Sequence, residues 1–108
     1  DIQRSRGLGD VYKRQGRAGY AAFAPTKAAQ RILAQSIARE AGPKGVHVAY
    51  VTIDAVIDLR WTRKRYPDKP DDFFIKPEEI ADEVFHVANQ SKGAWSFDVE
   101  IRPHAENW

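Results

Sequence analysis

A long helical pattern that ends abruptly and is followed by a β-branched run constrains the fold most. From Tyr20 to Ala41 the chain is rich in alanine, and Gly42-Pro43 then places a helix-ending glycine before a proline. Residues 45–53 are mostly apolar and β-branched, which predicts a strand buried on both faces, as in a parallel sheet. Small or apolar residues occur almost all round the helix, so we expect it to be buried on more than one side.

A second helix and a second strand follow after a loop. Residues 60–72 are rich in charge and proline and predict the loop, while Pro77 followed by two glutamates is typical of a first helical turn. The expected apolar stripe of this helix consists of Ile80, Ala81, Val84, Phe85 and Ala88. Residues 94–103 alternate apolar and polar side chains, which predicts a strand with one wetter face. The order helix, strand, loop, helix, strand predicts an α/β fold.

Several motifs in this frame resemble the C-terminal portion of the short-chain dehydrogenase/reductase (SDR) superfamily. Residues 38–48 are close to the family pattern A-x-E-x-x-x-x-G-I-R-V, and residues 77–81 match its P-E-E-I-A. The agreement extends from about Gly16 to Pro103. The resemblance implies that residues 16–108 are the C-terminal fragment of a divergent SDR protein, with a doubly wound parallel sheet of the Rossmann type.

The catalytic Tyr-x-x-x-Lys motif of that family falls on Phe23 and Lys27. In the family the tyrosine hydroxyl exchanges a proton with the substrate oxygen, and the lysine lowers the tyrosine pKa and binds the nicotinamide ribose. The resemblance therefore assigns Lys27 to catalysis and to cofactor binding, and Phe23 to the place of the usual tyrosine. Phenylalanine has no hydroxyl for proton transfer. Tyr20 lies on nearly the same helix face but about 10 Å away along the axis, which favours a packing or solvent role for it over a substitute donor.

The turn after the first strand departs from the family pattern. Where relatives have P-G followed by x-x-x-T, this chain has Ile53-Asp54 and then Asp58. The resemblance places the nicotinamide carboxamide of NAD or NADP against the backbone of Ile53, Asp54 and Val56. Asp54 replaces a glycine, which puts the backbone angles of the turn in question. Asp58 would bring a negative charge near the cofactor diphosphate, which is unfavourable unless that charge is neutralised.

Two functions remain open for the intact parent protein. The first is an NAD(P)-dependent oxidoreductase acting on a small carbonyl or alcohol substrate, in which another group or a water supplies the proton, because hydride transfer depends on cofactor placement. The second is a catalytically silent NAD(P)-binding or scaffold protein. The resemblance also implies a homo-oligomer through the Tyr20–Ala41 helix. It places the glycine-rich dinucleotide loop and the catalytic serine upstream, so we expect the fragment alone to be inactive and to bind no cofactor.

The first fifteen residues do not follow the domain pattern. Residues 5–15 resemble the translation of a transposase sequencing adapter, so we treat residues 1–15 as a non-native segment that we expect to be disordered. They carry the whole formal net charge of +2, since the rest of the chain holds thirteen basic and thirteen acidic residues. Charge therefore gives no support for a nucleic-acid or membrane partner.

A basic cluster in the expected loop has two explanations. Its members are Arg60, Arg63, Lys64 and Arg65, with Trp61 and Tyr66 among them. The cluster could form a nucleic-acid surface with stacking aromatics, or it could belong to the segment that closes over substrate in the SDR family, which its length and prolines favour.

The chain has no cysteine, and its three histidines show no metal-ligand spacing, so we expect no metal site. Without a signal-peptide pattern or a membrane-length apolar run, we expect a cytoplasmic protein.

Overall fold

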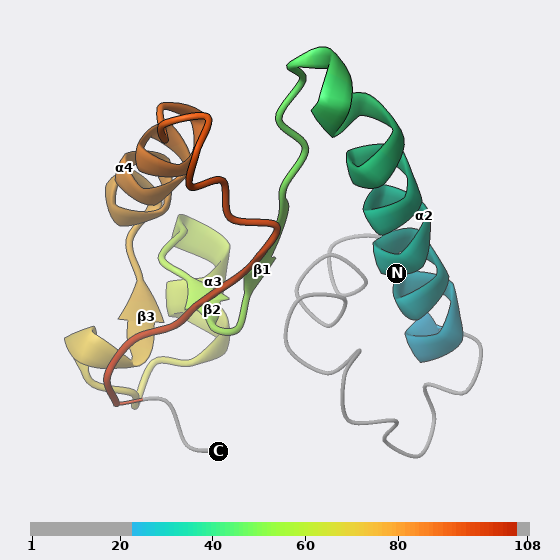
Figure 1. Ribbon diagram of the computed structural model, residues 1–108. Helices are drawn as coiled ribbons and strands as arrows, with labels where there is room; N and C mark the ends of the chain where they lie inside the picture. Colours follow the sequence, from blue (N-terminus) through green and yellow to red (C-terminus); the bar gives the residue numbers. More distant parts are fainter. Residues whose placement is uncertain (1–22, 106–108) are drawn as a thin grey trace.

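The computed structural model describes residues 23–105 of the chain. The adapter-like segment 1–15, Tyr20 and the first residues of the expected helix lie outside the described residues. Helix α2 (Phe23–Ala41) is followed by the short 3₁₀ helix η1 (Gly42–Lys44). The other elements are β1 (Tyr50–Ile53), β2 (Val56–Ile57), α3 (Arg60–Arg65), η2 (Asp71–Phe73), β3 (Phe74–Ile75), α4 (Pro77–Ala88) and β4 (Asp98–Ile101) (Figure 1).

The described strands form two small parallel sheets. β1 pairs with β4, with Tyr50 opposite Asp98, and β2 pairs with β3, with Val56 opposite Phe74. The connection from β1 to β4 contains α3 and α4, as parallel strands require. In Figure 1, α2 lies to the right of the β1–β4 pair, and α3 and α4 lie to its left. The predicted α/β class is confirmed, whereas the segment between β1 and α4 contains β2, α3, η2 and β3 in addition to the expected loop.

Helix α2 ends where the sequence predicts, but the strand after it begins later. Gly45 has a φ of 86°, and its N–H donates to the Gly42 carbonyl oxygen at 2.8 Å. Glycine adopts this left-handed conformation without the steric cost that a Cβ brings. Strand β1 then starts at Tyr50 rather than at residue 45, because β4 supplies only the four residues Asp98–Ile101 for pairing.

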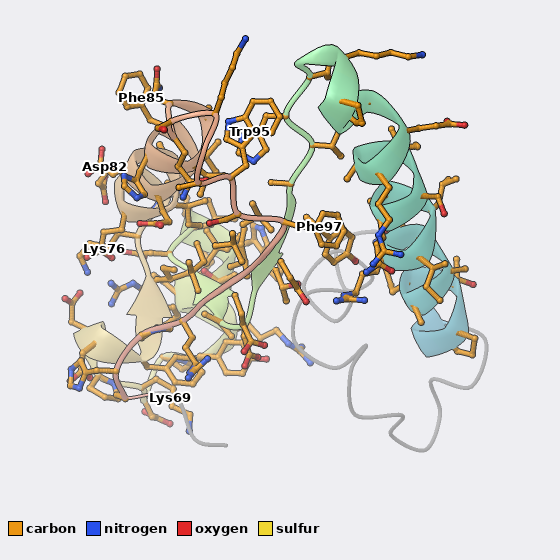
Figure 2. All side chains as sticks on the ribbon, in the orientation of Figure 1. Lys69, Lys76, Asp82, Phe85, Trp95 and Phe97 are labelled. Carbon is orange, nitrogen blue, oxygen red and sulfur yellow. The ribbon has the colours of Figure 1, made fainter. Side chains whose placement is uncertain are left out.

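Polar contacts of Arg31 and Tyr50 connect α2 to the sheet. The Arg31 guanidinium donates from Nη2 to Asp98 Oδ2 at 2.6 Å, and its central carbon lies 5.8 Å from the ring centre of Phe97. Figure 2 shows Phe97 in the space between the sheet and α2. The Tyr50 hydroxyl donates to the carbonyl oxygen of Lys27 at 3.5 Å. These contacts set the position of the helix relative to β1 and β4.

The apolar residues of α2 are exposed in this chain. Ile32 and Leu33 are 60% and 61% exposed, and Ile37 is 44% exposed. The prediction of a helix buried on more than one side is therefore wrong for the described chain. The physical reason is that β1 and β4 are the only sheet strands in residues 23–105 against which α2 packs.

An aromatic stack holds the segments before β1 and β4 together. The rings of His47 and Trp95 are stacked and nearly parallel, with centroids 4.7 Å apart and planes inclined by 2°. His47 Nε2 lies 2.7 Å from the carbonyl oxygen of Ser96, and the Trp95 indole N–H donates to the carbonyl oxygen of Gln90 at 3.3 Å. The two segments that lead into β1 and β4 are therefore held together next to the paired residues.

Helix α4 begins at Pro77 as predicted, but its buried face overlaps the expected stripe only at Ile80. Val87 is 5% exposed and Ile80 is half-buried. Val84 and Phe85 of the expected stripe are 45% and 71% exposed, and Figure 2 shows Phe85 at the outer side of the helix. The choice of stripe was therefore wrong, because α4 carries apolar residues on two faces and the described chain covers one of them.

The core of the described residues is small and lies around β3, the turn after β1, and the facing sides of α3 and α4. Its buried apolar residues are Ala55, Phe74, Ile75 and Val87, and its buried polar residues are Thr52, Asp54 and Thr62. The expected loop over 60–72 contains α3 and part of η2 instead. Strands β2 and β3 were not predicted, because two residues are too few to show a hydrophobic period. Within residues 23–105 no helix has both the length and the hydropathy needed to span a bilayer.

Candidate functional site

The first two predicted site residues lie at the start of α2. Phe23 is the first residue of this helix and Lys27 lies about one turn further on. The side chain of Phe23 is outside the described part of the chain, whereas Lys27 is half-buried. The Tyr50 hydroxyl donates to the main-chain oxygen of Lys27. The structure thus brings the Lys27 turn of the helix beside β1.

The other predicted residues form the turn at the carboxyl end of β1. Ile53 ends β1, Asp54 and Ala55 are 5% and 3% exposed, and Val56 begins β2. The Asp54 N–H donates to the carbonyl oxygen of Ile101 at 2.9 Å, so the turn stays hydrogen-bonded to β4. The carboxyl ends of parallel strands are the usual ligand-binding edge of an open α/β sheet.

The aspartate that replaces the family glycine does not strain this turn. Among residues 23–105 every non-glycine residue has a negative φ, Asp54 included. An L-residue with negative φ pays none of the steric cost of left-handed backbone. The backbone of the turn is therefore compatible with aspartate, which answers the question raised by the sequence.

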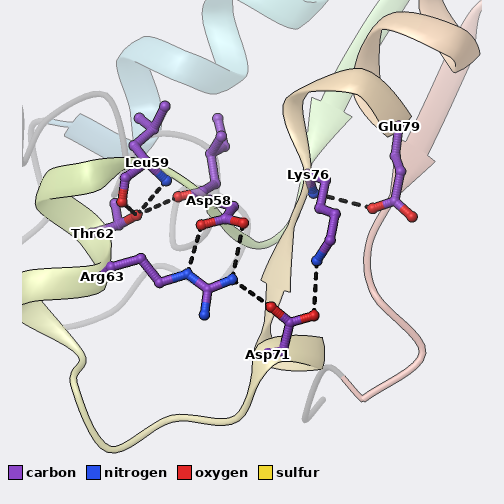
Figure 3. A network of polar contacts seen from close by, with 8 residues as sticks. Asp58, Leu59, Thr62, Arg63, Asp71, Lys76 and Glu79 are labelled. Atoms are coloured by element: carbon purple, nitrogen blue, oxygen red, sulfur yellow. Dashed lines mark hydrogen bonds and ion pairs between the residues drawn. The ribbon is translucent and has the colours of Figure 1, made fainter.

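Asp58, which stands in the place of the family threonine, is paired inside the chain. Arg63 donates from Nε to Asp58 Oδ1 at 2.6 Å and from Nη2 to Asp58 Oδ2 at 2.9 Å (Figure 3). Two parallel bonds of this kind are the strong fork geometry of arginine and carboxylate. The hydrogen bonds from Arg63 hold the pKa of the Asp58 carboxyl below its usual value. The negative charge at this position is therefore neutralised by a neighbour five residues along.

The ion pair extends into a network that links α3, η2 and the start of α4. Arg63 Nη2 also donates to Asp71 Oδ1 at 2.6 Å, and Lys76 Nζ donates to Asp71 Oδ2 at 3.0 Å (Figure 3). The hydrogen bond from Arg63 and, to a lesser extent, the one from Lys76 lower the pKa of Asp71. The bond to Asp71 in turn raises the pKa of Lys76. The Lys76 N–H donates to Glu79 Oε1 at 3.1 Å, which caps the first turn of α4.

Thr62 fixes the helix that carries Arg63. The residue is 3% exposed, and its Oγ1 hydroxyl donates to the carbonyl oxygen of Ile57 at 2.6 Å. The same oxygen accepts the N–H of Leu59 at 2.8 Å. The Arg63 guanidinium carbon also lies 4.1 Å from the ring centre of Phe74. Helix α3 is thereby tied to both strands of the second sheet.

The sequence pointed to Asp58 and to the basic cluster separately but did not predict that they pair. Their pairing requires α3 to fold directly after β2, and neither element was predicted. The threonine at the third position of a helix, which can bond the backbone preceding the helix, was the available signal. Within the described residues, no three His, Asp or Glu side chains group in a way that could hold a metal ion.

Comparison with known proteins supports the fold. No protein-family model and no curated protein matches the chain. Among solved structures, a short-chain dehydrogenase from Rhodopseudomonas palustris is similar, with 36% sequence identity and a TM-score of 0.61. The similarity covers 85% of this chain and 34% of that dehydrogenase, so the chain spans about a third of its length. The chain therefore has an α/β fold similar to that of part of a short-chain dehydrogenase.

Proposed function

We propose that this chain is part of an NAD(P)-dependent short-chain oxidoreductase that acts on a carbonyl or alcohol substrate. The similarity to the Rhodopseudomonas palustris dehydrogenase, at 36% identity over 85% of the chain, is the observation that carries this proposal. Because the chain spans 34% of that protein, the activity is proposed for a longer protein that contains the chain. In it, we propose, the sheet continues into a doubly wound Rossmann-type domain.

The described residues fit a nicotinamide dinucleotide at the carboxyl end of β1. The turn at Asp54 keeps its bond to β4, and the Asp58 charge is neutralised by Arg63, so neither departure from the family pattern opposes the cofactor. Main-chain groups of Ile53, Asp54 and Val56 would hold the carboxamide, as in the family. When bound, the nicotinamide ring accepts or donates the hydride.

Lys27 is the side chain that we assign to the nicotinamide ribose. Its place one turn into α2, with its carbonyl oxygen bonded to Tyr50, supports this role because the lysine turn lies beside β1. Phe23 occupies the place of the proton donor without supplying a proton. The proton must then come from another group of the longer protein or from water.

Cofactor affinity tests the assignment of Lys27. We expect Lys27→Ala in the longer protein to raise the Kd for NADPH or NADH roughly ten-fold, since a charge-assisted hydrogen bond is lost. Lys44→Ala is the matched control, because Lys44 is an exposed lysine of η1 at the other end of α2. Equal affinities of the Lys27 and Lys44 variants would refute the assignment.

Phe23 favours a second candidate function, a catalytically silent NAD(P)-binding or scaffold protein. The catalytic hydroxyl of the family is missing at this position, so cofactor binding could persist without turnover. The variant Phe23→Tyr separates the two functions in the longer protein. Turnover by the unmodified protein supports the oxidoreductase, and turnover that appears only with the restored tyrosine supports the silent protein.

We also propose that α2 mediates a homo-oligomer. The exposure of Ile32, Leu33 and Ile37 supports an interface on this helix. The substitution Leu33→Glu should lower the mass measured by light scattering to that of a single subunit, because a buried unpaired charge is costly. The exposed polar position Gln30 on the same helix provides the control Gln30→Glu. An unchanged mass for Leu33→Glu would contradict the proposal.

A further inference from the structure

Helix α3 presents three basic side chains on one face. Arg60, Arg63 and Lys64 are spaced three and four residues apart, which places them together on the helix surface. All three line one open depression of the surface. Its other lining residues are Asp58, Leu59, Pro67, Pro77 and Glu78. The basic face therefore opens on a hollow between α3 and the start of α4.

The charges of this depression do not cancel. Arg63 is committed to the carboxylates of Asp58 and Asp71. Among the described residues, no hydrogen bond or ion pair engages the side chain of Arg60 or Lys64. Glu78 is the one carboxylate of the lining outside the Arg63 pair. Two unpaired cations thus face a single carboxylate, and the depression carries a local excess of positive charge.

The two unpaired cations are also unfavourable for the helix that carries them. Arg60 and Lys64 are four residues apart on a helix of six residues, and like charges at this spacing repel. An anion between them would relieve that repulsion. The helix can accept such a ligand without losing its place, because Thr62 bonds Ile57 of β2 and Arg63 bonds Asp58, the residue after that strand.

We infer that this depression binds a phosphate group of a ligand, with Arg60 and Lys64 as the binding residues. Arginine offers a planar fork of donors and lysine a compact charge, and both are common phosphate ligands. Arg63 acts as a positioning residue, because it bonds Asp58, whose N–H donates to the carbonyl oxygen of Ile75 in β3. The identity of the ligand, a dinucleotide or a phosphorylated substrate, rests on the proposed oxidoreductase function.

Inorganic pyrophosphate is the probe that tests phosphate binding without any turnover. In ¹⁵N-labelled protein, we expect pyrophosphate to shift the backbone amide signals of residues 60–65 and the indole signal of Trp61 in a saturable way. The Trp95 indole signal serves as internal reference, because its N–H is bonded to Gln90 away from the depression. Absence of a saturable shift at residues 60–65 would overturn the inference.

Variants distinguish a site from general attraction of anions. Arg60→Gln and Lys64→Gln should each raise the Kd for pyrophosphate roughly five- to ten-fold, as expected for the loss of one charge-assisted bond. Arg39→Gln is the matched control, because Arg39 is an exposed arginine in the last turn of α2. Equal weakening by the Arg39 and Arg60 variants would show nonspecific attraction and contradict the site. Calorimetry on the longer protein provides the same comparison if a variant of the short chain loses its fold.

A second arm identifies the source of the phosphate. If Arg60→Gln also weakens ADP-ribose binding to the longer protein, the phosphate belongs to the dinucleotide. If it weakens pyrophosphate but spares ADP-ribose, the phosphate belongs to the substrate. A longer protein that binds pyrophosphate through Arg60 but never oxidises NAD(P)H would refute the oxidoreductase and leave the phosphate site intact. Normal turnover with pyrophosphate affinity unaffected by Arg60→Gln would refute the site alone.

Discussion

The hydroxyl of Thr62 provides the sharpest test of how the site is held. It donates to the carbonyl oxygen of Ile57 at 2.6 Å and accepts the N–H of Leu59 at 2.8 Å, in a residue that is 3% exposed. Thr62→Val keeps the shape of the side chain but removes both bonds. Each bond contributes about 1 kcal/mol net, and leaving a buried partner unsatisfied costs about 1–3 kcal/mol. We therefore expect the free energy of unfolding to fall by about 2–3 kcal/mol.

Thr62→Ser is the matched control for this prediction. Serine keeps the hydroxyl and loses only a methyl group, so its cost should stay near 1 kcal/mol, the value of about one buried methylene. Urea unfolding followed by circular dichroism measures both variants, with the slope of the transition checked for equality. If the valine variant is as stable as the serine variant, the hydroxyl does not anchor α3. The reasoning about how Arg63 is positioned would then be wrong.

Three further predictions concern the ion network, the end of α2 and the buried face of α4. In the folded chain the pKa values of Asp58 and Asp71 lie below the ordinary value of 3.8, so their contribution to stability is complete above that pH and is lost as the pH falls through the folded values. The urea midpoint of unfolding, measured as the pH is lowered, should show this loss, and Asp71→Asn should make the loss smaller. An acid profile that is unchanged in the variant would contradict the network. Gly45→Ala should lower the free energy of unfolding by about 1–2 kcal/mol in urea, because an alanine is strained at a φ of 86°. A steric clash adds nothing, since the nearest atom to an added Cβ is the flexible end of Lys92 at 3.7 Å. An alanine variant as stable as the unmodified chain would contradict this strain. Val87→Ala should lower the free energy of unfolding by about 1–2 kcal/mol, because Val87 is buried. Phe85→Ala should change it by less than about 0.5 kcal/mol, because Phe85 is exposed. Thermal unfolding that ranks the two variants in the opposite order would contradict the observed buried face.

Local signals in the sequence located the two long helices, α2 and α4, but not α3. Gly42-Pro43 ended the first helix within a residue of its observed end, and Pro77 began α4. These signals work because a left-handed glycine and a proline act on the backbone at their own positions. The alternating exposure predicted for the last strand is also observed over Asp98–Ile101.

Features that depend on distant residues were harder to predict. Strand β1 is shorter than its β-branched run, because its length is set by β4. Strands β2 and β3 have two residues each and exist only through pairing with one another. The buried face of α4 was chosen wrongly, because which apolar face is covered depends on the rest of the fold.

The same division holds for the candidate site. The sequence identified Asp58 as a charge that needs a partner, but its partner Arg63 became available only with the fold of α3. The roles of Lys27, Ile53, Asp54 and Val56 came from resemblance to the SDR family and stay predictions. The structure adds that the turn at Asp54 has ordinary backbone angles.

The most direct test of the account is NAD(P)H oxidation by the unmodified longer protein that contains this chain, measured over a panel of aldehydes and ketones. We predict that at least one carbonyl compound is reduced to its alcohol with one equivalent of cofactor oxidised, despite Phe23. We also predict that Lys27→Ala lowers this rate at limiting cofactor. A protein that binds the cofactor but reduces no substrate until Phe23 is changed to tyrosine would contradict the proposed activity.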